Sequence, residues 1–251
     1  MTNAYPLPPR PAFLGSAIGL LIIFLWCTHL AYLFTTFEPS NRQGAFILTA
    51  FFHLALQGWL TTGLFITAHD AMHGTVSRIK WLNHLIGAVA SFLYAAMSYP
   101  MLRRNHFKHH EGPATPEDPD FNAASQNFFV WFGSFIWRYK TWSQIILMAL
   151  LYNFFERVLG ISEITIWLFW VIPSLWGSLQ LFYFGTYLPH RLPLEPQMQP
   201  HRARSQAKNH LWSFFSCYFF GYHWEHHESP RTEWWRLWEL KNLSLPKAQA
   251  K

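Results

Sequence analysis

The chain has 251 residues, of which 51% are apolar, 19% aromatic and only 13% charged, about half the usual charged fraction. Its formal net charge is +6, but the basic residues stand in short groups between apolar runs, as at Arg103, Arg104 and Lys108. This distribution is typical of loops that face anionic lipid and argues against a nucleic-acid groove. The mean hydropathy of +0.05 stays low for a membrane protein partly because 14 Trp and 10 Tyr score poorly on hydropathy scales, although both residues suit membrane interfaces.

Proline-rich sequence precedes the first apolar run and does not resemble a cleavable signal peptide, so this run is expected to stay in the mature protein. Cys27 and Cys217 both lie in apolar stretches. They are predicted to be small buried side chains rather than a disulfide or a metal-binding pair.

Four apolar segments are long enough to cross a hydrocarbon core of ~30 Å, which takes about 20 residues. Two shorter apolar stretches with polar breaks, 81–102 and 127–137, are predicted to be interfacial or re-entrant helices, and 211–222 a short aromatic helix. We expect one all-α integral-membrane domain over residues 1–251, with two transmembrane hairpins and a cytoplasmic helical cap formed by 69–141 and 189–240. The predicted spans are about 13–37, 44–68, 142–159 and 164–188.

Charge placement predicts the orientation of these spans. The loops at 38–42 and 160–163 contain a single basic residue between them, whereas the other polar regions contain most of the Lys and Arg. By the positive-inside rule, the N-terminus, the middle region and the C-terminus face the cytoplasm.

Three histidine clusters stand at the ends of apolar segments, and the sequence contains 14 histidines in all. Side chains three or four residues apart share one face of a helix, so each cluster can direct its imidazoles at one centre. A further histidine ends the fourth predicted span. These positions are His69 and His73; His106, His109 and His110; His190; and His223, His226 and His227.

The predicted topology places all of these histidines at the cytoplasmic membrane face, where ionisable residues are usually functional. Neutral imidazole suits Zn, Fe, Cu and Ni, and one ion takes about four to six ligands, so the set exceeds what a single ion uses. The sequence has no helical Glu-x-x-His pairs of the soluble carboxylate-bridged type, and Asp70 stands where zinc proteases have Glu. The clusters therefore favour two adjacent iron ions.

Other polar residues have less distinctive positions. The isolated histidines are predicted to be structural, in hydrogen bonds or at interfaces: His29, His53, His84, His201 and His210. Asp70, Asp118 and Asp120 flank the clusters and are candidates to accept the second N–H of metal-bound imidazoles. Helix capping and loop solubility remain open as alternative roles for each acid.

The boxes HDxMH, HxxHH and HxxHH, in this order, resemble those of the membrane fatty-acid desaturase and hydroxylase superfamily. Within it, the wider motifs HDAMHG, FGTYLPH and GYHWEHHESP and the Pro119-Asp120-Phe121 segment resemble the bacterial and cyanobacterial β-carotene ketolases, over residues 55–240. The resemblance implies that the nine histidines above are the metal ligands, with His190 in the least distinctive motif.

The resemblance also implies the reaction. A ketolase oxygenates carbon 4 of the β-ionone ring in two O₂-dependent hydroxylations, and loss of water leaves a ketone. It implies a lipid-soluble carotenoid as substrate, two Fe ions as cofactor and a ferredoxin-type electron donor. Aromatic residues near the boxes are candidates for an apolar substrate tunnel, or equally for anchoring and packing: Phe182, Tyr183, Phe184, Trp212, Phe214, Phe215, Tyr218, Phe219, Phe220 and Tyr222.

Three other functions remain open at this point. A fatty-acid or sterol desaturase or hydroxylase would use the same metal chemistry on another lipid. A zinc-dependent membrane hydrolase would need only one ion. A metal carrier or haem-binding subunit would need ionisable residues deep in several spans, and the predicted spans are nearly free of charge apart from Glu156 and Arg157.

Overall fold

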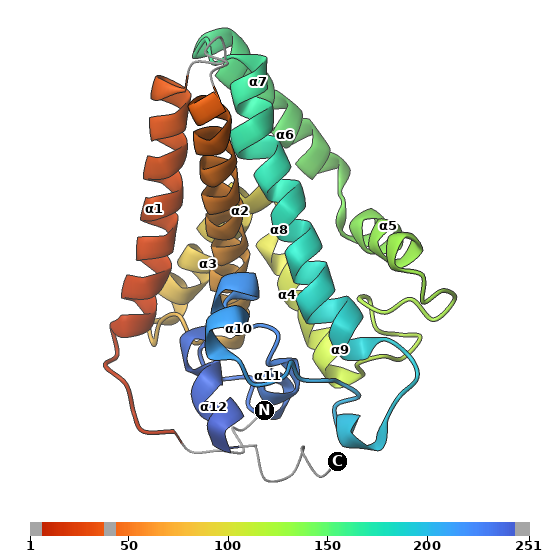
Figure 1. The fold of residues 1–251 in the computed structure, drawn as a ribbon. Helices are drawn as coiled ribbons and strands as arrows, with labels where there is room; N and C mark the ends of the chain where they lie inside the picture. Colours follow the sequence, from red (N-terminus) through yellow and green to blue (C-terminus); the bar gives the residue numbers. More distant parts are fainter. Residues whose placement is uncertain (1–6, 38–43, 244–251) are drawn as a thin grey trace.

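The computed structural model describes residues 7–37 and 44–243, and all regular structure in these residues is helical, as predicted. Long helices stand side by side, and shorter helices gather at one end of them (Figure 1). The histidine boxes lie at this end, which we call the histidine end. The loop 38–42, on which part of the orientation argument rests, lies outside the described residues.

Three helical segments are long and apolar enough to cross a membrane. They are α1 (Leu14–Thr36), α2 (Gly44–His73) and a continuous run over Glu163–His190. The last two extend past the predicted ends at 68 and 188, and these extra turns place His69, His73 and His190 on the spans themselves. The third run consists of α7 (Glu163–Ile166), η2 (Trp167–Val171), α8 (Ile172–Phe182), η3 (Tyr183–Tyr187) and α9 (Leu188–His190).

The predicted span at 142–159 forms α6 (Trp142–Asn153), with 12 residues, followed by the 5-residue π-helix η1 (Phe154–Val158). This helix is shorter than the three candidate spans. The stretch predicted to be interfacial or re-entrant is sharply bent, and both of its ends lie at the histidine end, since His73 just before it and His106 near its end are 2.7 Å apart at Nε2. There α3 (Lys80–Ala95) and α4 (Tyr99–Glu111) meet at 100°. The described residues therefore contain three candidate spans, or four if this bent pair counts as one.

Local sequence explains where several helices begin and end. The Asn127 side chain accepts hydrogen bonds from two backbone N–H groups of α5 (Phe128–Tyr139), and Thr141 and Gln144 form a capping box at the start of α6. Gly74 takes φ +77° just after His73. This left-handed position, which glycine adopts without a Cβ clash, ends α2 at its last histidine.

The helix α2 occupies the centre of the bundle and packs against α1, α3 and α8. Its apolar side chains there, such as Leu64 and Ile66, are fully buried, and Trp26 on α1 donates from Nε1 to Thr61 Oγ1 at 2.9 Å. The prediction that both cysteines are buried is wrong for Cys27, which is exposed on α1, because this helix turns one side outward; Cys217 is buried.

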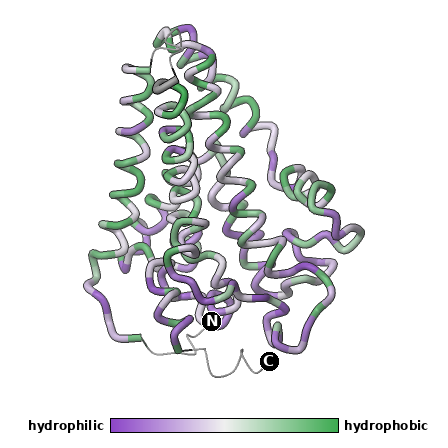
Figure 2. Tube along the Cα trace, in the orientation of Figure 1, coloured by the Kyte–Doolittle hydropathy of each residue, from purple (hydrophilic) through white to green (hydrophobic). Residues whose placement is uncertain are grey.

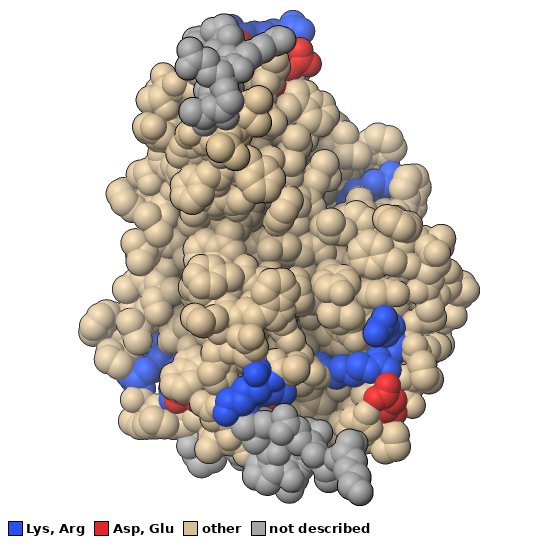
Figure 3. Space-filling view, viewed as in Figure 1, with Lys and Arg blue, Asp and Glu red and all other residues tan. Residues whose placement is uncertain are grey.

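Hydrophobic residues predominate along the long helices (Figure 2), and large apolar side chains on them are exposed, such as Leu20, Phe24 and Leu179, as lipid-facing surfaces require. In the face shown in Figure 3, charged side chains gather toward the two ends, and the broad band between them is almost free of charge. At the histidine end, α10 (His210–Cys217), α11 (His223–Glu228), η5 (Trp234–Arg236) and α12 (Leu237–Leu243) lie beneath the long helices (Figure 1).

Candidate metal centre

Four elements direct histidines into one buried region at the histidine end. The pair from α2 is four residues apart, and the sets from α4 and α11 have spacings of three and four, so helical geometry aligns them. The π-helix η3 precedes α9 and its His190; such wide turns are common near functional sites. All nine predicted ligands meet here, in two groups.

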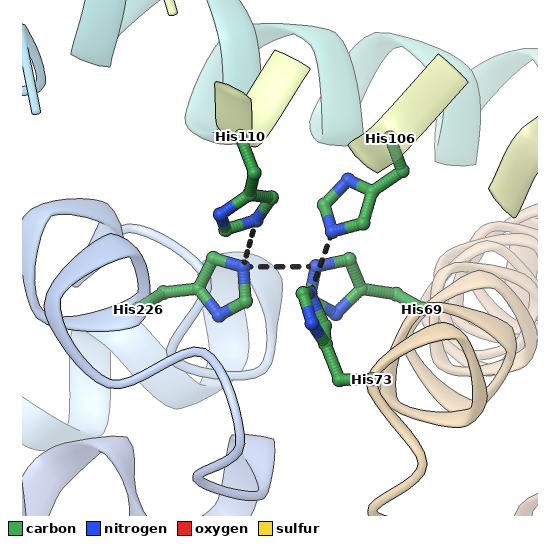
Figure 4. A group of neighbouring side chains, drawn as sticks. All are labelled: His69, His73, His106, His110 and His226. Atoms are coloured by element: carbon green, nitrogen blue, oxygen red, sulfur yellow. Dashed lines mark hydrogen bonds between the residues drawn. The ribbon is translucent and has the colours of Figure 1, made fainter. Parts of the chain in front are cut away.

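The first cluster is formed by five histidines with one ring nitrogen each within 4.8 Å of the others: His69, His73, His106, His110 and His226. Figure 4 shows these five rings pointing toward one another from α2, α4 and α11. The Nε2 atoms of His73 and His106 are 2.7 Å apart, those of His110 and His226 3.0 Å, and those of His69 and His226 3.2 Å.

The second cluster is formed by four buried histidines: His109, His190, His223 and His227. The Nε2 atom of His227 lies 3.2 Å from His109 Nε2 and 3.1 Å from His223 Nε2. His190 Nε2 is buried without a hydrogen-bond partner, while its Nδ1 lies 3.0 Å from the Arg202 carbonyl oxygen. The orphaned atom therefore faces the cluster with its lone pair available.

The spacing of these nitrogens is also the spacing that bound metal ions require. Ligand nitrogens about 2.0–2.1 Å from one ion lie about 3 Å from each other, which is the spacing seen in both clusters. Burial lowers the pKa of His223, His226 and His227 well below the usual histidine value. These rings are therefore neutral, and neutral imidazole is the form that coordinates metal.

The two clusters touch each other. The ring centroids of His110, in the first cluster, and His227, in the second, are 4.3 Å apart. His109 and His110 are neighbours on α4 and face different clusters, because successive residues on a helix point about 100° apart. The arrangement could hold two adjacent metal ions with an all-imidazole ligand set.

Two of the three flanking acids lie beside the second cluster. His109 Nδ1 is 2.9 Å from Asp118 Oδ2 and 3.8 Å from Asp120 Oδ2. Burial alone would raise the pKa of Asp118, but its attraction to His109 and two hydrogen bonds hold that pKa below the usual value. Burial and the charge of Asp118 raise the pKa of Asp120 to about 6, and Tyr139 donates a hydrogen bond to it.

The third acid, Asp70, is placed differently. Its Oδ1 lies 3.5 Å from His69 Nδ1, beyond hydrogen-bond distance, and its Oδ2 accepts a hydrogen bond from the Trp234 backbone N–H at 3.0 Å. Asp70 thus joins α2 to the C-terminal segment behind the first cluster.

The isolated histidines lie outside both clusters. His29 contacts His53 and Gln57, His84 contacts Tyr99, and His210 contacts Tyr222 and Asn242. His201 comes nearest, with its ring centroid 5.9 Å from that of His227, but its Nε2 is bonded to Glu228.

An apolar cavity ends at the histidines. Its walls include His69 and His106 of the first cluster and His109 and His223 of the second. Its polar wall groups include Asp120 and Tyr139. The remaining lining residues are mostly apolar and come from α2, α3, α4, α5, α8 and η3, from the α3–α4 bend and from the turn before α11: Phe65, Met72, Tyr94, Met97, Leu102, Phe135, Ile136, Ser178, Leu181, Gly185, Thr186 and Phe220.

Of the aromatic residues that the sequence suggested for a tunnel, only Phe220 lines this cavity. Its ring packs against His69 and His223, with centroids 4.9 and 5.2 Å away. The sequence did not single out the wall residues from α3 and α5, because they lie outside the histidine boxes. No local signal distinguishes Tyr94 on α3 or Phe135 on α5 from ordinary packing residues, since only the packing of these helices against one another brings them to the site.

Comparisons with known proteins agree with this site. A β-carotene ketolase of Paracoccus sp. (strain PC1) is 37% identical over 91% of this chain and 94% of its own length. A β-carotene ketolase of Haematococcus lacustris is 38% identical over 97% of this chain and 83% of its own. A zeaxanthin 4-ketolase of Chlamydomonas reinhardtii is 36% identical over 97% of this chain, which spans 56% of that longer protein.

The family model described as fatty acid desaturase matches residues 44–166 and 141–250, a range that contains every histidine of both clusters. The match therefore covers most of the chain and the whole site. The chain belongs to the fatty acid desaturase family.

Proposed function

We propose that the protein is a membrane-bound di-iron oxygenase that introduces a keto group at carbon 4 of the β-ionone ring of carotenoids. On β-carotene it would give echinenone, with one ketone, and then canthaxanthin, with two. The observation that carries the proposal is the apolar cavity whose inner wall is built from histidines of both clusters. The similarity to β-carotene ketolases over more than nine-tenths of the chain supports the choice of substrate.

The two clusters would hold one iron ion each. Iron bound there supplies what no side chain can, the activation of O₂ for attack on an unactivated C–H bond. Two hydroxylations at the same carbon, each using one O₂ and two electrons, give a geminal diol that loses water to become the ketone.

The residues of the chain position the ring and the ligands. The mostly apolar wall, with Phe65, Leu102 and Leu181 among its members, binds a hydrocarbon ring and excludes bulk water from the reacting carbon. We propose that Asp118 fixes the His109 ring by accepting its Nδ1–H, and that Asp70 and Asp120 support the ligands from farther away.

Electrons would come from a ferredoxin-type donor. A basic cavity of about 800 Å³ at the histidine end reaches His73 and Met72, and its rim includes Arg78, Lys80 and Arg103. This charge suits an acidic redox protein and would bring it close to the first cluster. Substituting Arg103 by Glu is expected to raise the KM for the donor without changing bound iron.

The histidine end would face the cytoplasm of a bacterial inner membrane or a cyanobacterial membrane. Among the described residues, most Lys and Arg lie toward this end, whereas the opposite end carries Arg157 beside Glu156 and Glu163. This asymmetry supports the positive-inside orientation. It also supports four crossings, with α6 and η1 as the fourth, because the bent α3–α4 pair begins and ends at the histidine end.

Expression in cells that accumulate β-carotene, followed by pigment analysis, tests the proposal. The expected products are echinenone and canthaxanthin, and His109→Ala is expected to abolish both. Unchanged β-carotene together with altered fatty acids or sterols would instead indicate a lipid desaturase or hydroxylase. Unchanged β-carotene with no altered lipid would contradict the proposed oxygenase activity on β-carotene.

A further inference from the structure

A second cavity adjoins the cavity at the metal centre. Its volume is about 360 Å³, within the range of about 300–1,000 Å³ that ligand sites occupy. Its outer wall comes from α6 and from the η2–α8 part of the third span. The residues that line only this second cavity are Ala95, Lys140, Gln144, Ile145, Met148, Val171, Ser174 and Leu175.

The two cavities are adjacent and share part of their walls, and we call this shared part the narrow point. Five residues line both: Tyr94, Met97, Ile136, Tyr139 and Ser178. The hydroxyl groups of Tyr94 and Ser178 lie 2.8 Å apart, and this hydrogen bond joins α3 to α8 across the narrow point. From there the inner cavity continues to the histidines of both clusters.

The outer mouth opens where a membrane would be. Leu175 and Ile145, on its rim, are 57% and 42% exposed, although both are large apolar side chains. Leu175 lies near the middle of the 28-residue run Glu163–His190. With a rise of about 1.5 Å per residue and a hydrocarbon core of ~30 Å, this position corresponds to the depth of the lipid chains.

We propose that the carotenoid enters sideways from the bilayer through this mouth, between α5, α6 and α8, and passes Tyr94 and Ser178 to reach the metal centre. We call the mouth the lateral portal; its role rests on the proposed function. The other large opening near the clusters is the basic cavity of Arg78, Lys80 and Arg103. A hydrocarbon dissolved in lipid would have to leave its apolar surroundings to cross that charged opening. The lateral portal instead opens directly into the lipid in which the hydrocarbon is dissolved.

Adjacent isoleucines on α6 provide a matched test. Ile145 lines the lateral portal, whereas Ile146, which is 58% exposed, lines neither cavity. In vesicles loaded with limiting β-carotene, Ile145→Trp is expected to lower the initial rate of ketone formation about tenfold or more, since the larger side chain overfills the passage. Ile146→Trp is expected to stay close to wild type. Iron content, measured in each variant, is expected to remain unchanged.

A second pair of variants, on α5, keeps the test decisive if a variant of the first pair fails to fold. Ile136 lines both cavities, and Val130, which is 55% exposed, lines neither. Ile136→Trp is expected to repeat the loss and Val130→Trp to leave the rate unchanged. Wild-type rates in both portal variants, or equal losses in the portal and control variants, would overturn the lateral route. Absence of ketone with the wild-type protein would contradict the proposed function itself, and this outcome differs from a failure of the lateral route, in which the wild-type protein still makes ketone.

Discussion

At the scale of single residues, two imidazoles of the second cluster each have a polar partner at Nδ1, on the side away from the cluster. His109 faces the carboxylate of Asp118 at 2.9 Å, and His190 faces the Arg202 carbonyl oxygen at 3.0 Å. In both rings Nδ1 takes this partner, so Nε2 is left to point into the cluster. Such partners fix the tautomer and orientation of a ligand ring.

Asp118→Asn is expected to weaken metal binding at the second cluster about 10–100-fold, because the amide removes the negative charge behind His109. Titration of the metal-free protein with Fe²⁺ measures this affinity. Glu117→Gln, at an exposed neighbouring position, serves as the control and is expected to bind as wild type does. Equal affinities for Asp118→Asn and wild type would show that the carboxylate has no such role.

His190→Ala is expected to reduce bound iron from two ions toward one per chain, since it removes one of the four ligands of the second cluster. Elemental analysis of the purified variant checks this. His201→Ala is the matched control, because this imidazole also lies beside His227 but is bonded to Glu228. Loss of iron in the control, with full iron in His190→Ala, would reverse the assignment of the two histidines.

At the scale of elements, α4 and α11 each join the two clusters. On α4, His106 and His110 belong to the first and His109 to the second; on α11, His226 belongs to the first and His223 and His227 to the second. On another part of the cavity wall, Gly185 in the π-helix η3 leaves room for the Phe220 ring. A Cβ added at Gly185, within η3, would lie 2.2 Å from a ring carbon of Phe220, and that ring packs on His69 and His223.

Gly185→Ala is therefore expected to lower the stability of the metal-bound protein by about 1–3 kcal/mol, the usual range for overpacking. Thermal unfolding in detergent measures the effect, and iron content should fall with it, because Phe220 is pushed toward two ligands. Gly133→Ala, where a Cβ would meet nothing within 4 Å, should leave both unchanged. An unaltered melting temperature in Gly185→Ala would mean that Phe220 moves away freely.

The sequence predicted the helices that carry the histidines, because a spacing of three or four residues has a direct meaning on a helix. It also placed the nine histidines at one end, through the charges of the loops. It could not predict the 100° bend between α3 and α4, since Ala96 takes a left-handed conformation that its residue type does not announce. For the same reason it missed Met97, which lies in that bend and lines the cavity.

The fourth crossing shows a related difficulty. The segment at 142–159 and the stretch 81–102 are both apolar, and composition favoured the first. In the structure, α6 with η1 is shorter than the three candidate spans, and α3 and α4 form a bent pair that is a broken span or a re-entrant loop. The bend agrees with a re-entrant stretch at 81–102, and the number of crossings stays a prediction, because hydropathy does not reveal where a helix bends.

At the scale of the whole molecule, the clusters tie together segments that are far apart in the chain. The first cluster joins α2, α4 and α11, and the second joins α4, α9 and α11. Any ligand that binds only the folded state stabilises it, by about 2.7 kcal/mol at a hundredfold excess over Kd. Removing the metal with a chelator is expected to lower the melting temperature and to loosen α11 first. Hydrogen exchange of residues 223–228 with and without metal checks the second part, and unchanged protection would contradict it.

The number and kind of metal ions per chain test the central claim most directly. Elemental analysis of protein purified from membranes without chelators should give two iron ions per chain, one for each cluster of imidazoles. Substituting a ligand of either cluster should remove iron from that cluster. About one zinc per chain, with no iron, would contradict the di-iron centre and favour a hydrolytic enzyme instead.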